Sequence, residues 1–487
     1  MPLILSGNVA SATAATTYSI DNSCRFNGTD AKLSKSLGAP SDADKFTWSF
    51  WIKRGNTDTG DDNYRSVIRC HSSATVYTSC TFENNDVLSF GNRQGAGAGG
   101  HKGRLITNRV FRDVAAWYHI VCVWDSGNAT AGDRMKLYVN GVEETSFSTD
   151  TNPTSDEDSG NLDGNTIDIG VHESSYWWDG YIAEVFFCDG QAYGPTDFGE
   201  FDSDSPTIWK PKDASGDLTF GNNGFYLDFK DSANLGNDAN GGTDLTETNI
   251  AAVDQATDTP TNNFCTLNSL DNYWFASTFS EGNCKTVTGS SAYCWHTTTM
   301  GLTAGKWYWE VKHPTAQATA SSFDGIVTYP PTSKTVVLGV TNSSDYSLNG
   351  NDGKTHNGSG TGATYAAAVA TNGIVGVALD LDNNKIYYSH NGAWGDGSGS
   401  WDSTTFDAAV GDVSITAAAS SNSGVYFPAV GDYASGAAAT FEMNFGGCPA
   451  FTISSAVADE NGYGAFEYAP PSGFLAICTK NLGSDGG

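Results

Sequence analysis

Basic side chains are scarce in this chain. Lysine and arginine number 25 against 55 aspartates and glutamates, which leaves a formal net charge of −30 over 487 residues. A surface of this sign repels the phosphates of nucleic acid and of anionic membranes, so we expect neither as a partner. The same charge keeps an aromatic-rich surface in solution and attracts divalent cations.

Long apolar runs are missing as well. No run approaches the roughly 18 residues that a membrane-spanning helix needs, so we expect no membrane insertion. The segment Met1–Leu5 is too short for a secretory signal and lacks the basic flank of one. We therefore expect a soluble protein made in the cytosol, whose length suits about two to four domains.

Methionine is rare, with 4 residues, whereas glycine (56), phenylalanine (25), tyrosine (21) and tryptophan (13) are abundant. This composition favours pleated sheets joined by polar turns over helices, so the sequence predicts an all-β protein. Apolar or alternating segments predict strands in the first half of the chain at Ser23–Phe26, Phe46–Lys53, Tyr64–Cys70, Val87–Phe90, Tyr118–Trp124, Met135–Val139 and Ile182–Phe187.

The second half shows the same kind of pattern. Strands are predicted at Lys306–Val311, Val336–Val340, Ile374–Leu381, Lys385–Ser389, Tyr426–Pro428 and Thr440–Phe445. Alternation within the first of these places Trp307, Trp309 and Val311 on one face. Two Asn-Gly pairs, at 140–141 and 391–392, predict type I′ hairpin turns, because that turn needs two residues with positive φ.

Residues 211–263 separate the two halves. They are rich in Asp, Asn, Gly and Thr, carry one apolar island at Gly224–Phe229, and end near Pro260. The sequence therefore predicts an N-terminal arm or attachment segment at 1–20, a first β-sandwich at 21–210, a linker with short strands at 211–263, and a second β-sandwich at 264–487.

The ten cysteines contain no Cys-x-x-Cys pair of the kind that zinc sites and redox enzymes use. Cys122 and Cys188 lie within apolar strands and are expected to be buried thiols. Only Cys70 with Cys80, and Cys284 with Cys294, have the spacing of a hairpin disulfide. Whether either pair forms stays open at this point.

Several motifs, taken in their order, carry a resemblance to known folds. The run "FTWSFWIK" (46–53), "WYHIVCVWD" (117–125), "KLYVNG" (136–141) and "GYIAEV" (180–185) resembles the laminin-G-like, concanavalin A-like jelly rolls. In the second half, "KWYWEV" (306–311), "LGV" (338–340), "VGVALDLDNNKIYYSHNG" (375–392) and "YFPAVGDY" (426–433) resemble the SPRY (B30.2) fold. The resemblance implies two concanavalin A-like β-sandwich domains in series after a short arm.

The whole chain, from "MPLILSGN" through "DQATDTPTNNF" to "PPSGFLAICTKNL", resembles tail-fibre and other virion structural proteins of marine bacteriophages. This resemblance implies a protein made in the host cytoplasm and displayed on the phage particle, where it binds a host-surface glycan or an outer-membrane protein. It also implies contacts with other virion proteins and a homo-oligomer, for which a trimer is expected. The alternative is a structural virion component, such as a head fibre, decoration or tail-adaptor protein.

Catalytic patterns are weak throughout. A glycosidase on this fold needs two carboxylates about 5–9.5 Å apart, which on a strand means acids at alternate positions. Glu143 and Glu144 are adjacent, and Asp156–Asp158 lies in a turn-rich loop. No Gly-x-Ser-x-Gly elbow and no His-Glu-x-x-His pair occurs. We expect a non-catalytic protein, with a polysaccharide depolymerase as the third hypothesis.

Exposed aromatic rings are the best candidates for ligand contacts, because they present flat apolar faces with few rotamers to order. Tyr176 and Trp177 lie in one aromatic cluster, and 272–275 forms another. The SPRY resemblance implies ligand loops that contain Tyr346, His356 and Trp394. No cofactor is expected, but calcium is a candidate, and the densest run of oxygen ligands holds Asp228, Asp231 and Asp238.

Overall fold

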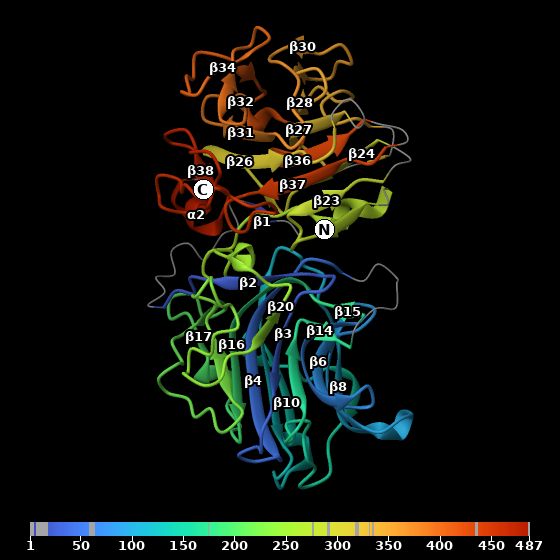
Figure 1. Cartoon of the computed structure of the whole chain (residues 1–487). Coiled ribbons are helices and arrows are strands. Elements are labelled where there is room, and N and C mark those ends of the chain that lie inside the picture. Colours follow the sequence, from blue (N-terminus) through green and yellow to red (C-terminus); the bar gives the residue numbers. More distant parts are fainter. Residues whose placement is uncertain are drawn as a thin grey trace. The chain divides into compact units, whose positions relative to one another are not determined.

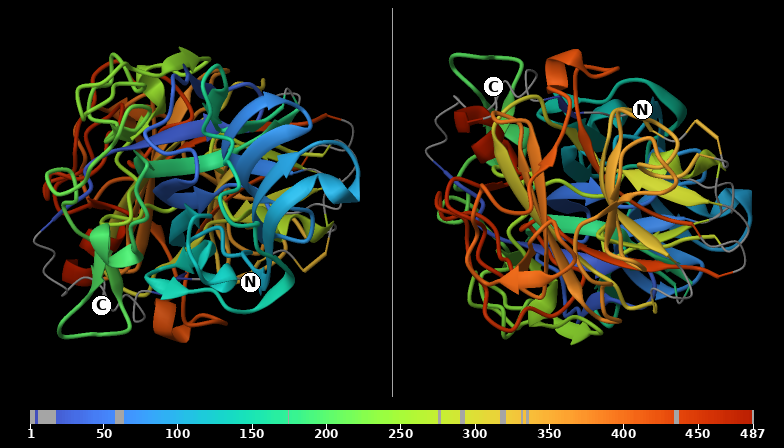
Figure 2. Two further views of the ribbon diagram at one scale, coloured as in Figure 1. Left: turned by 90° about the horizontal axis from the view of Figure 1, so that it is seen from below. Right: turned by 90° about the horizontal axis from the view of Figure 1, so that it is seen from above.

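The chain folds into two β-sandwiches. The computed structural model describes residues 4–5, 18–57, 64–173, 175–274, 277–289, 293–316, 321–330, 332–333, 336–433 and 437–485. It divides into two compact units, Ala14–Thr261 (the first sandwich) and Met1–Thr13 together with Asn262–Gly487 (the second sandwich). Strands and loops dominate every view (Figures 1 and 2), which confirms the predicted all-β class.

The first sandwich consists of two eight-stranded sheets. The first of them, the β4 sheet, contains in spatial order β11 (Val142–Glu143), β10 (Met135–Val139), β9 (Trp117–Asp125), β4 (Lys45–Arg54), β16 (Asp179–Asp189), β2 (Ser23–Asn27) and β21 (Gln255–Ala256), with β19 (Phe225–Leu227) also paired to β16. The other, the β6 sheet, contains β12 (Phe147–Thr151), β8 (His101–Val110), β7 (Val87–Gln94), β6 (Val76–Phe82), β5 (Arg65–Ser73), β13 (Thr166–Ile169), β3 (Lys32–Ser36) and β20 (Thr246–Thr248).

Aromatic side chains from both sheets fill the space between them. Trp48 of β4 contacts Phe90 of β7 at 6.3 Å between ring centroids, and Trp124 of β9 is fully buried in the same core. The predicted turn at Asn140-Gly141 is confirmed, since both residues have positive φ, 49° and 78°. Alternation along the strands therefore sets which side chains enter this core.

The predicted linker 211–263 is instead part of the first sandwich. Its apolar island forms β19, which pairs with β16, while β20 and β21 extend one edge of each sheet. The apolar island at Gly224–Phe229 is visible in the sequence. The strands β19, β20 and β21 have only two or three residues each, which is too short for a hydrophobic periodicity to be detected. Of the predicted arm, Tyr18 and Ile20 also pack on this unit, against Trp51 and Ala183.

The face of the β4 sheet that points away from the core is covered. Residues 193–220, with the hairpin of β17 (Gly199–Phe201) and β18 (Trp209–Pro211), lie over an apolar cluster that includes Phe186, Phe198 and Phe220. Phe186 also stacks on Tyr226 at 4.4 Å. The β4 sheet is therefore buried on both faces.

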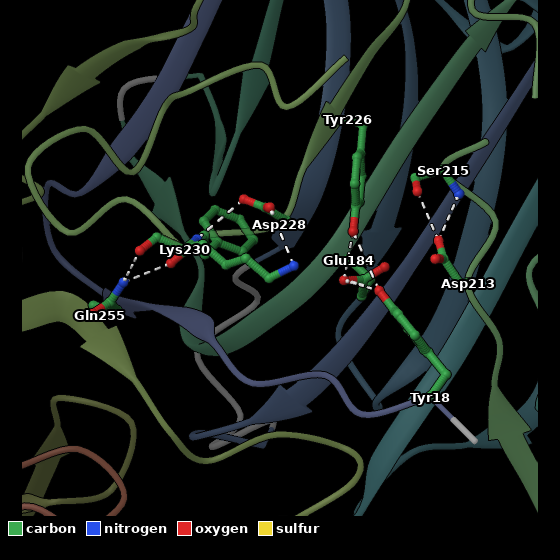
Figure 3. Close-up of polar contacts among 9 residues, drawn as sticks. Tyr18, Glu184, Asp213, Ser215, Tyr226, Asp228, Lys230 and Gln255 are labelled. Carbon is green, nitrogen blue, oxygen red and sulfur yellow. Dashed lines mark hydrogen bonds and ion pairs between the residues drawn. The ribbon is translucent and has the colours of Figure 1, made fainter. Parts of the chain in front are cut away.

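A carboxylate lies inside this covered face. Glu184 sits at a bulge of β16 with φ 50°, where two consecutive side chains point outward, and it is 4 % exposed. The hydroxyls of Tyr18 and Tyr226 donate to its Oε1 at 3.1 and 2.8 Å (Figure 3). Burial raises the pKa of Glu184 to about 7. The hydrogen bonds from the two tyrosines act in the opposite direction, because they stabilise the charged carboxylate.

The second sandwich is built from a ten-stranded and a six-stranded sheet. The larger, the β26 sheet, contains β22 (Thr278–Ser280), β23 (Lys285–Val287), β37 (Thr440–Asn444), β26 (Lys306–Lys312), β31 (Ile374–Asp380), β32 (Lys385–His390), β33 (Ala393–Gly395) and β34 (Trp401–Ser403), with β35 (Val413–Ser414) on β32 and β38 (Leu475–Ala476) on β26. The smaller, the β27 sheet, contains β24 (Cys294–Thr297), β36 (Phe427–Asp432), β27 (Ser322–Val327), β28 (Tyr346–Asn349), β29 (Lys354–His356) and β30 (Ala363–Thr364).

Short elements complete this unit. β1 (Ile4–Leu5) pairs in parallel with β25 (Met300–Gly301), and the chain ends in α2 (Thr479–Asp485). Trp307, Trp309 and Val311 point together into the core, as predicted. In the described ranges of the chain, no helix has the length and apolar character needed to cross a bilayer.

Buried carboxyls recur in the second sandwich. The Glu310 carboxylate accepts hydrogen bonds from the Tyr308 hydroxyl, the Asn444 amide and the backbone N–H groups of Glu467 and Tyr468, and so holds the chain's C-terminal segment to the sheet. Burial raises the pKa of Glu310 to about 7. Burial likewise raises the pKa of Asp432 to about 7 and that of Asp271 to about 6.

One strand prediction in this region is wrong, and the two possible disulfides that the spacing left open do not form. Val336–Val340 forms a turn, and β27 supplies the strand that its apolar run suggested. Cys284 directly precedes β23 of the β26 sheet, whereas Cys294 begins β24 of the β27 sheet. Neither Cys284 with Cys294 nor Cys70 with Cys80 forms a disulfide. Cys70 lies opposite Thr78, whereas Cys80 lies opposite Ile68, so the register places these two thiols out of step. Cys122 and Cys188 are buried, as expected.

Replacing Glu184 by Gln should stabilise the protein at alkaline pH. The folded state binds the Glu184 proton more tightly than the unfolded chain does, so stability is lost as pH rises from about 4.5 to about 7. Glutamine still accepts the tyrosine hydroxyls but carries no charge. We expect Glu184→Gln to raise the free energy of unfolding by about 2–3 kcal/mol at pH 8 and to change it little at pH 4.5.

Denaturant titrations at the two pH values measure this difference. Asp213→Asn is the matched control, because it removes one exposed negative charge close to Glu184 (Figure 3). An equal effect of Glu184→Gln at both pH values would contradict the assignment of the proton to Glu184.

Candidate ligand-binding cleft

The outer face of the β6 sheet is polar and open to solvent. Along β6, Cys80 and Phe82 enter the core, so Tyr77, Ser79 and Thr81 point outward. Leu88 and Phe90 of β7 face the core in the same way. The alternating pattern of these strands thus places a row of tyrosine, serine and threonine side chains on the outside.

A cleft of about 280 Å³ lies on this face. Its lining includes aromatic side chains at one end, small side chains on the floor, and charged side chains along the sides. These groups are, in that order, Tyr64, Tyr77, His172 and Tyr176; Ser79, Thr81, Ser89 and Gly91; and Glu83, Arg93, Arg104 and Glu173. We call this hollow the β6 cleft. A Cβ atom on Gly91 would lie 3.2 Å from Cγ of Arg104, so the glycine leaves the arginine stem room to lie along the floor.

The aromatic side chains form one wall. Tyr64 contacts Tyr176 edge to face, with ring centroids 5.6 Å apart, and His172 contacts Tyr77 at 5.2 Å. The guanidinium of Arg69 lies 4.6 Å from the centroid of the Tyr77 ring and supports it from the sheet. Tyr64 is 37 % exposed, which leaves its ring accessible to a ligand.

His172 is held in its neutral form. Burial, followed by the charge of Arg69, lowers the pKa of His172 to about 3. Its Nδ1 is buried and has no hydrogen-bond partner in the part of the chain that the structure describes. The imidazole therefore completes the aromatic wall as an uncharged ring.

The charged groups of the cleft are unequally paired. A terminal nitrogen of Arg104 donates to Oε1 of Glu83, and a terminal nitrogen of Arg69 lies 3.8 Å from Oε1 of Glu173. Arg93 donates from Nε to the carbonyl of Gly95 at 3.0 Å, and no carboxylate among the described residues lies within ion-pair distance of it. Both acids are thus paired to arginines, whereas one arginine is not paired to an acid.

A second hollow of about 440 Å³ adjoins the cleft. Arg93, His101 and Arg104 line both hollows, and the second is completed by Gly97, Thr149 and Thr151. Apart from Gly97, which lies in the loop between β7 and β8, these residues belong to β7, β8 and β12, which are neighbours in the β6 sheet. The two hollows together form a groove that crosses the strands.

This arrangement suits binding better than hydrolysis. Glycoside hydrolysis needs two carboxyls that act on the scissile bond, but the two carboxyls of the lining, Glu83 and Glu173, are each engaged by an arginine. Elsewhere, Cys294, His296 and the hydroxyl of Ser277 form a buried cluster. Burial raises the pKa of Cys294 to about 11 and lowers that of His296 to about 3, which is opposite to what a thiolate nucleophile requires.

The structure places the predicted site residues very differently. Tyr176 lines the β6 cleft. Trp177, its neighbour on β15 (Tyr176–Trp177), is half-buried and pairs with Val171 of β14 (Val171–His172). Of the second aromatic cluster, 272–275, the side chains of Tyr273, Trp274 and Phe275 lie outside the described residues.

The three candidates that the SPRY resemblance implied, Tyr346, His356 and Trp394, are buried or half-buried. Tyr346 is 3 % exposed, and its hydroxyl accepts from the Thr416 backbone at 2.9 Å. His356 is buried, with Nδ1 donating to the carbonyl of Ser359. Both residues lie on strands, and their burial leaves little side-chain surface for the ligand contact that the resemblance implied. Trp394 is half-buried and packs against Phe406 at 4.9 Å.

The calcium candidates each close a local turn. Asp228 and Asp231 accept from the backbone of Lys230 and Ala233, and Asp228 is also 3.6 Å from the Lys230 ammonium (Figure 3). Asp238 is buried, accepts from the Tyr226 backbone and lies 3.8 Å from the ammonium of Lys35. In the described segments, no group of three or more His, Cys, Asp or Glu side chains is arranged for a metal.

Sequence reasoning missed most of the cleft. Tyr64 was placed at the start of a strand, and Tyr77, Arg93, His101 and Arg104 were not singled out. The signal was present in "VYTSCTF" (76–82), where polar and apolar residues alternate. The alternation predicts an outward row but does not say that neighbouring strands bring arginines beside it.

Comparisons with known proteins agree with the architecture of this unit. The family described as the concanavalin A-like lectin/glucanases superfamily matches residues 27–191. The first sandwich is similar to that superfamily. The matched span contains every residue that lines the β6 cleft. It also supports the laminin-G-like domain predicted from the motifs.

Three solved structures share low sequence identity with parts of this chain. A SAP-like pentraxin from Limulus polyphemus is 20% identical over 36% of this chain and 78% of its own, with a TM-score of 0.27. The SPRY domain of human HERC1 is 16% identical over 33% and 86%, with a TM-score of 0.25. A putative carbohydrate binding protein from Bacteroides ovatus is 14% identical over 48% and 60%, with a TM-score of 0.31. A search of curated proteins gave no match.

His172 should resist protonation in the folded protein. Its pKa of about 3 means that the imidazole stays neutral at every pH above about 4, so protonation of the unfolded chain below its ordinary pKa of 6.5 lowers stability as pH falls. Replacing Arg69 by Met should raise the His172 pKa but leave it below 6.5, because burial is the larger cause. Imidazole NMR titration, assigned with His172→Gln, measures both values.

Arg109→Gln is the control for this titration, because Arg109 lies on β8 of the same sheet as Arg69 but outside the cleft. A His172 that titrates near 6.5 in the folded wild-type protein would contradict the buried, neutral ring.

Proposed function

We propose that this protein is a carbohydrate-binding protein displayed on the surface of a phage particle, with the β6 cleft as its glycan site. The observation that carries the proposal is the wall of tyrosine rings beside serine, threonine and arginine side chains on an open sheet face. Flat aromatic faces suit the apolar faces of sugar rings, and the hydroxyl and guanidinium groups suit sugar hydroxyls.

The proposed binding is non-catalytic. The two acids of the cleft are paired to arginines, and the match to a superfamily of lectins and glucanases fits either a binding or a hydrolytic protein. The pairing favours binding, because each acid of the cleft is already engaged by an arginine. No cofactor is needed for such a role.

The phage context is proposed from the order of motifs along the whole chain. In that setting the ligand is a glycan of the host cell surface, or an outer-membrane protein that carries one. The protein would act as a tail fibre or adhesin, with other virion proteins as its permanent partners. Repeated copies, for which we propose a trimer, would convert weak contacts at each cleft into firm attachment.

Removing the two accessible tyrosines should abolish most of the binding. We expect Tyr64→Ala combined with Tyr176→Ala to weaken binding of the full-length protein to glycan by about tenfold or more, since each exposed ring is worth about 1 kcal/mol or more in a sugar contact. Binding of labelled protein to candidate host cells and to an array of bacterial glycans measures the loss. Melting curves check that the variants remain folded.

Tyr433→Ala is the matched control, because Tyr433 is an exposed tyrosine of the second sandwich, 47 % accessible. Unchanged binding of the double variant would overturn the cleft assignment. Absence of binding to any host cell or glycan would favour a structural virion component. Release of reducing ends from a host polysaccharide would instead show a depolymerase.

A further inference from the structure

The groove on the β6 sheet has a positive end in a strongly negative protein. Arg93, His101 and Arg104 line both hollows and lie where the two meet. The second hollow has no carboxylate in its lining, since its other members are Gly97, Thr149 and Thr151. This composition stands out because the whole chain has a formal charge of −30.

Arg93 is the group that needs a partner. Its side chain is half-buried at the junction, where one hydrogen bond to the Gly95 carbonyl uses Nε. Arg93 lines both hollows, and no carboxylate of the described residues lies within ion-pair range of its guanidinium. A partly buried guanidinium gains most from a planar anion that accepts two parallel hydrogen bonds.

Arg104 can complete such a site from the next strand. Gly91 of β7 lies opposite Arg104 of β8, and Arg93 lies opposite His101, so the two arginines point outward from neighbouring strands. Glu83 engages a terminal nitrogen of Arg104 from the side of the first hollow. In the second hollow, Arg104 and Arg93 are accompanied by Gly97, His101, Thr149 and Thr151.

The pKa of His101 is affected by the positive charges of the two neighbouring arginines. Burial and then the charges of Arg104 and Arg93 lower the pKa of His101. Its Nδ1 is buried without a hydrogen-bond partner among the described residues. A neutral imidazole at this position can hydrogen-bond to a ligand without carrying charge of its own.

We propose that the ligand of this groove is an acidic glycan, whose carboxylate or sulfate binds between Arg93 and Arg104 while its sugar ring contacts the tyrosine wall. The inference rests on the proposed function and names the class of glycan. It also accounts for how a protein of such negative charge holds an acidic polymer: at physiological ionic strength, charges more than about 8 Å apart are screened, so the local arginines decide the interaction.

The test compares one polymer in two forms. Full-length protein is titrated with polygalacturonate and with the same polymer after its carboxyls have been reduced to alcohols. A second arm compares sulfated with unsulfated dextran and so separates sulfate from carboxylate recognition. We expect preference for an acidic form in at least one arm, and a loss of about tenfold or more in that preference with Arg93→Gln.

Two further variants make the result specific. Arg93→Lys keeps the charge but loses the planar fork, so it should bind the acidic polymer with intermediate affinity. Arg109→Gln removes an equal charge from the same sheet outside the groove and should behave like the wild type. Melting curves confirm folding of each variant.

The outcomes separate this inference from the proposed function. Equal binding of acidic and neutral polymers that depends on Tyr64 and Tyr176 but not on Arg93 would overturn the acidic ligand and keep the glycan site. Binding that depends on neither the tyrosines nor Arg93 would overturn both. A preference for acidic polymer that Arg93→Gln removes, with neutral binding changed less than about twofold, supports the inference.

Discussion

Burial of two sheets against each other is the constraint on which this structure depends. Each strand must turn every second side chain inward, so every strand also presents a second set of side chains to the opposite side. In the first sandwich, one outer sheet face is covered by other parts of the chain and the other is open to solvent. The β4 sheet is covered by residues 193–220 and by Tyr18 and Ile20, whereas the β6 sheet carries polar side chains and remains open.

This asymmetry is the reason why we propose the binding site on the β6 sheet. The outer face of the β4 sheet has apolar residues such as Phe186 and Tyr226, which are buried under the loops that cover it. The open face can use its outward side chains for recognition because the fold does not need them in a core. The rigid sheet also holds the aromatic and guanidinium groups in place before a ligand arrives, which lowers the entropy cost of binding.

Sequence patterns predicted the positions of strands and core residues better than they predicted which residues lie on the surface. Met135–Val139 was predicted to the residue, and the Trp307, Trp309 and Val311 face was correct, because each rests on strict local alternation. Tyr346 and His356 were expected in loops because of a resemblance, whereas they lie on strands β28 and β29 and are buried.

The cleft itself could be predicted only in fragments. Tyr176 was found because it belongs to an unusual aromatic run, but its partners come from four other segments of the chain. Which residues share a sheet face depends on strand order and on the register shift between Asn92 and Arg93, and neither is encoded locally. The prediction of a linker at 211–263 was wrong for a related reason. The short strands β19, β20 and β21 are defined by their pairing with strands far away in the sequence, and a local pattern does not show this pairing.

The buried carboxyls have a consequence for calorimetry. Glu184, Glu310 and Asp432, with pKa values of about 7, and Asp271, at about 6, each hold a proton in the folded state over a range where the unfolded chain releases it. Unfolding near neutral pH therefore releases these protons, while His119, His172 and His296, whose pKa values burial lowers to about 3, take up protons in the unfolded chain. The heat absorbed on melting then contains the buffer's own enthalpy of protonation, so the same transition has different apparent enthalpies in phosphate and in Tris, and their difference gives the net number of protons exchanged.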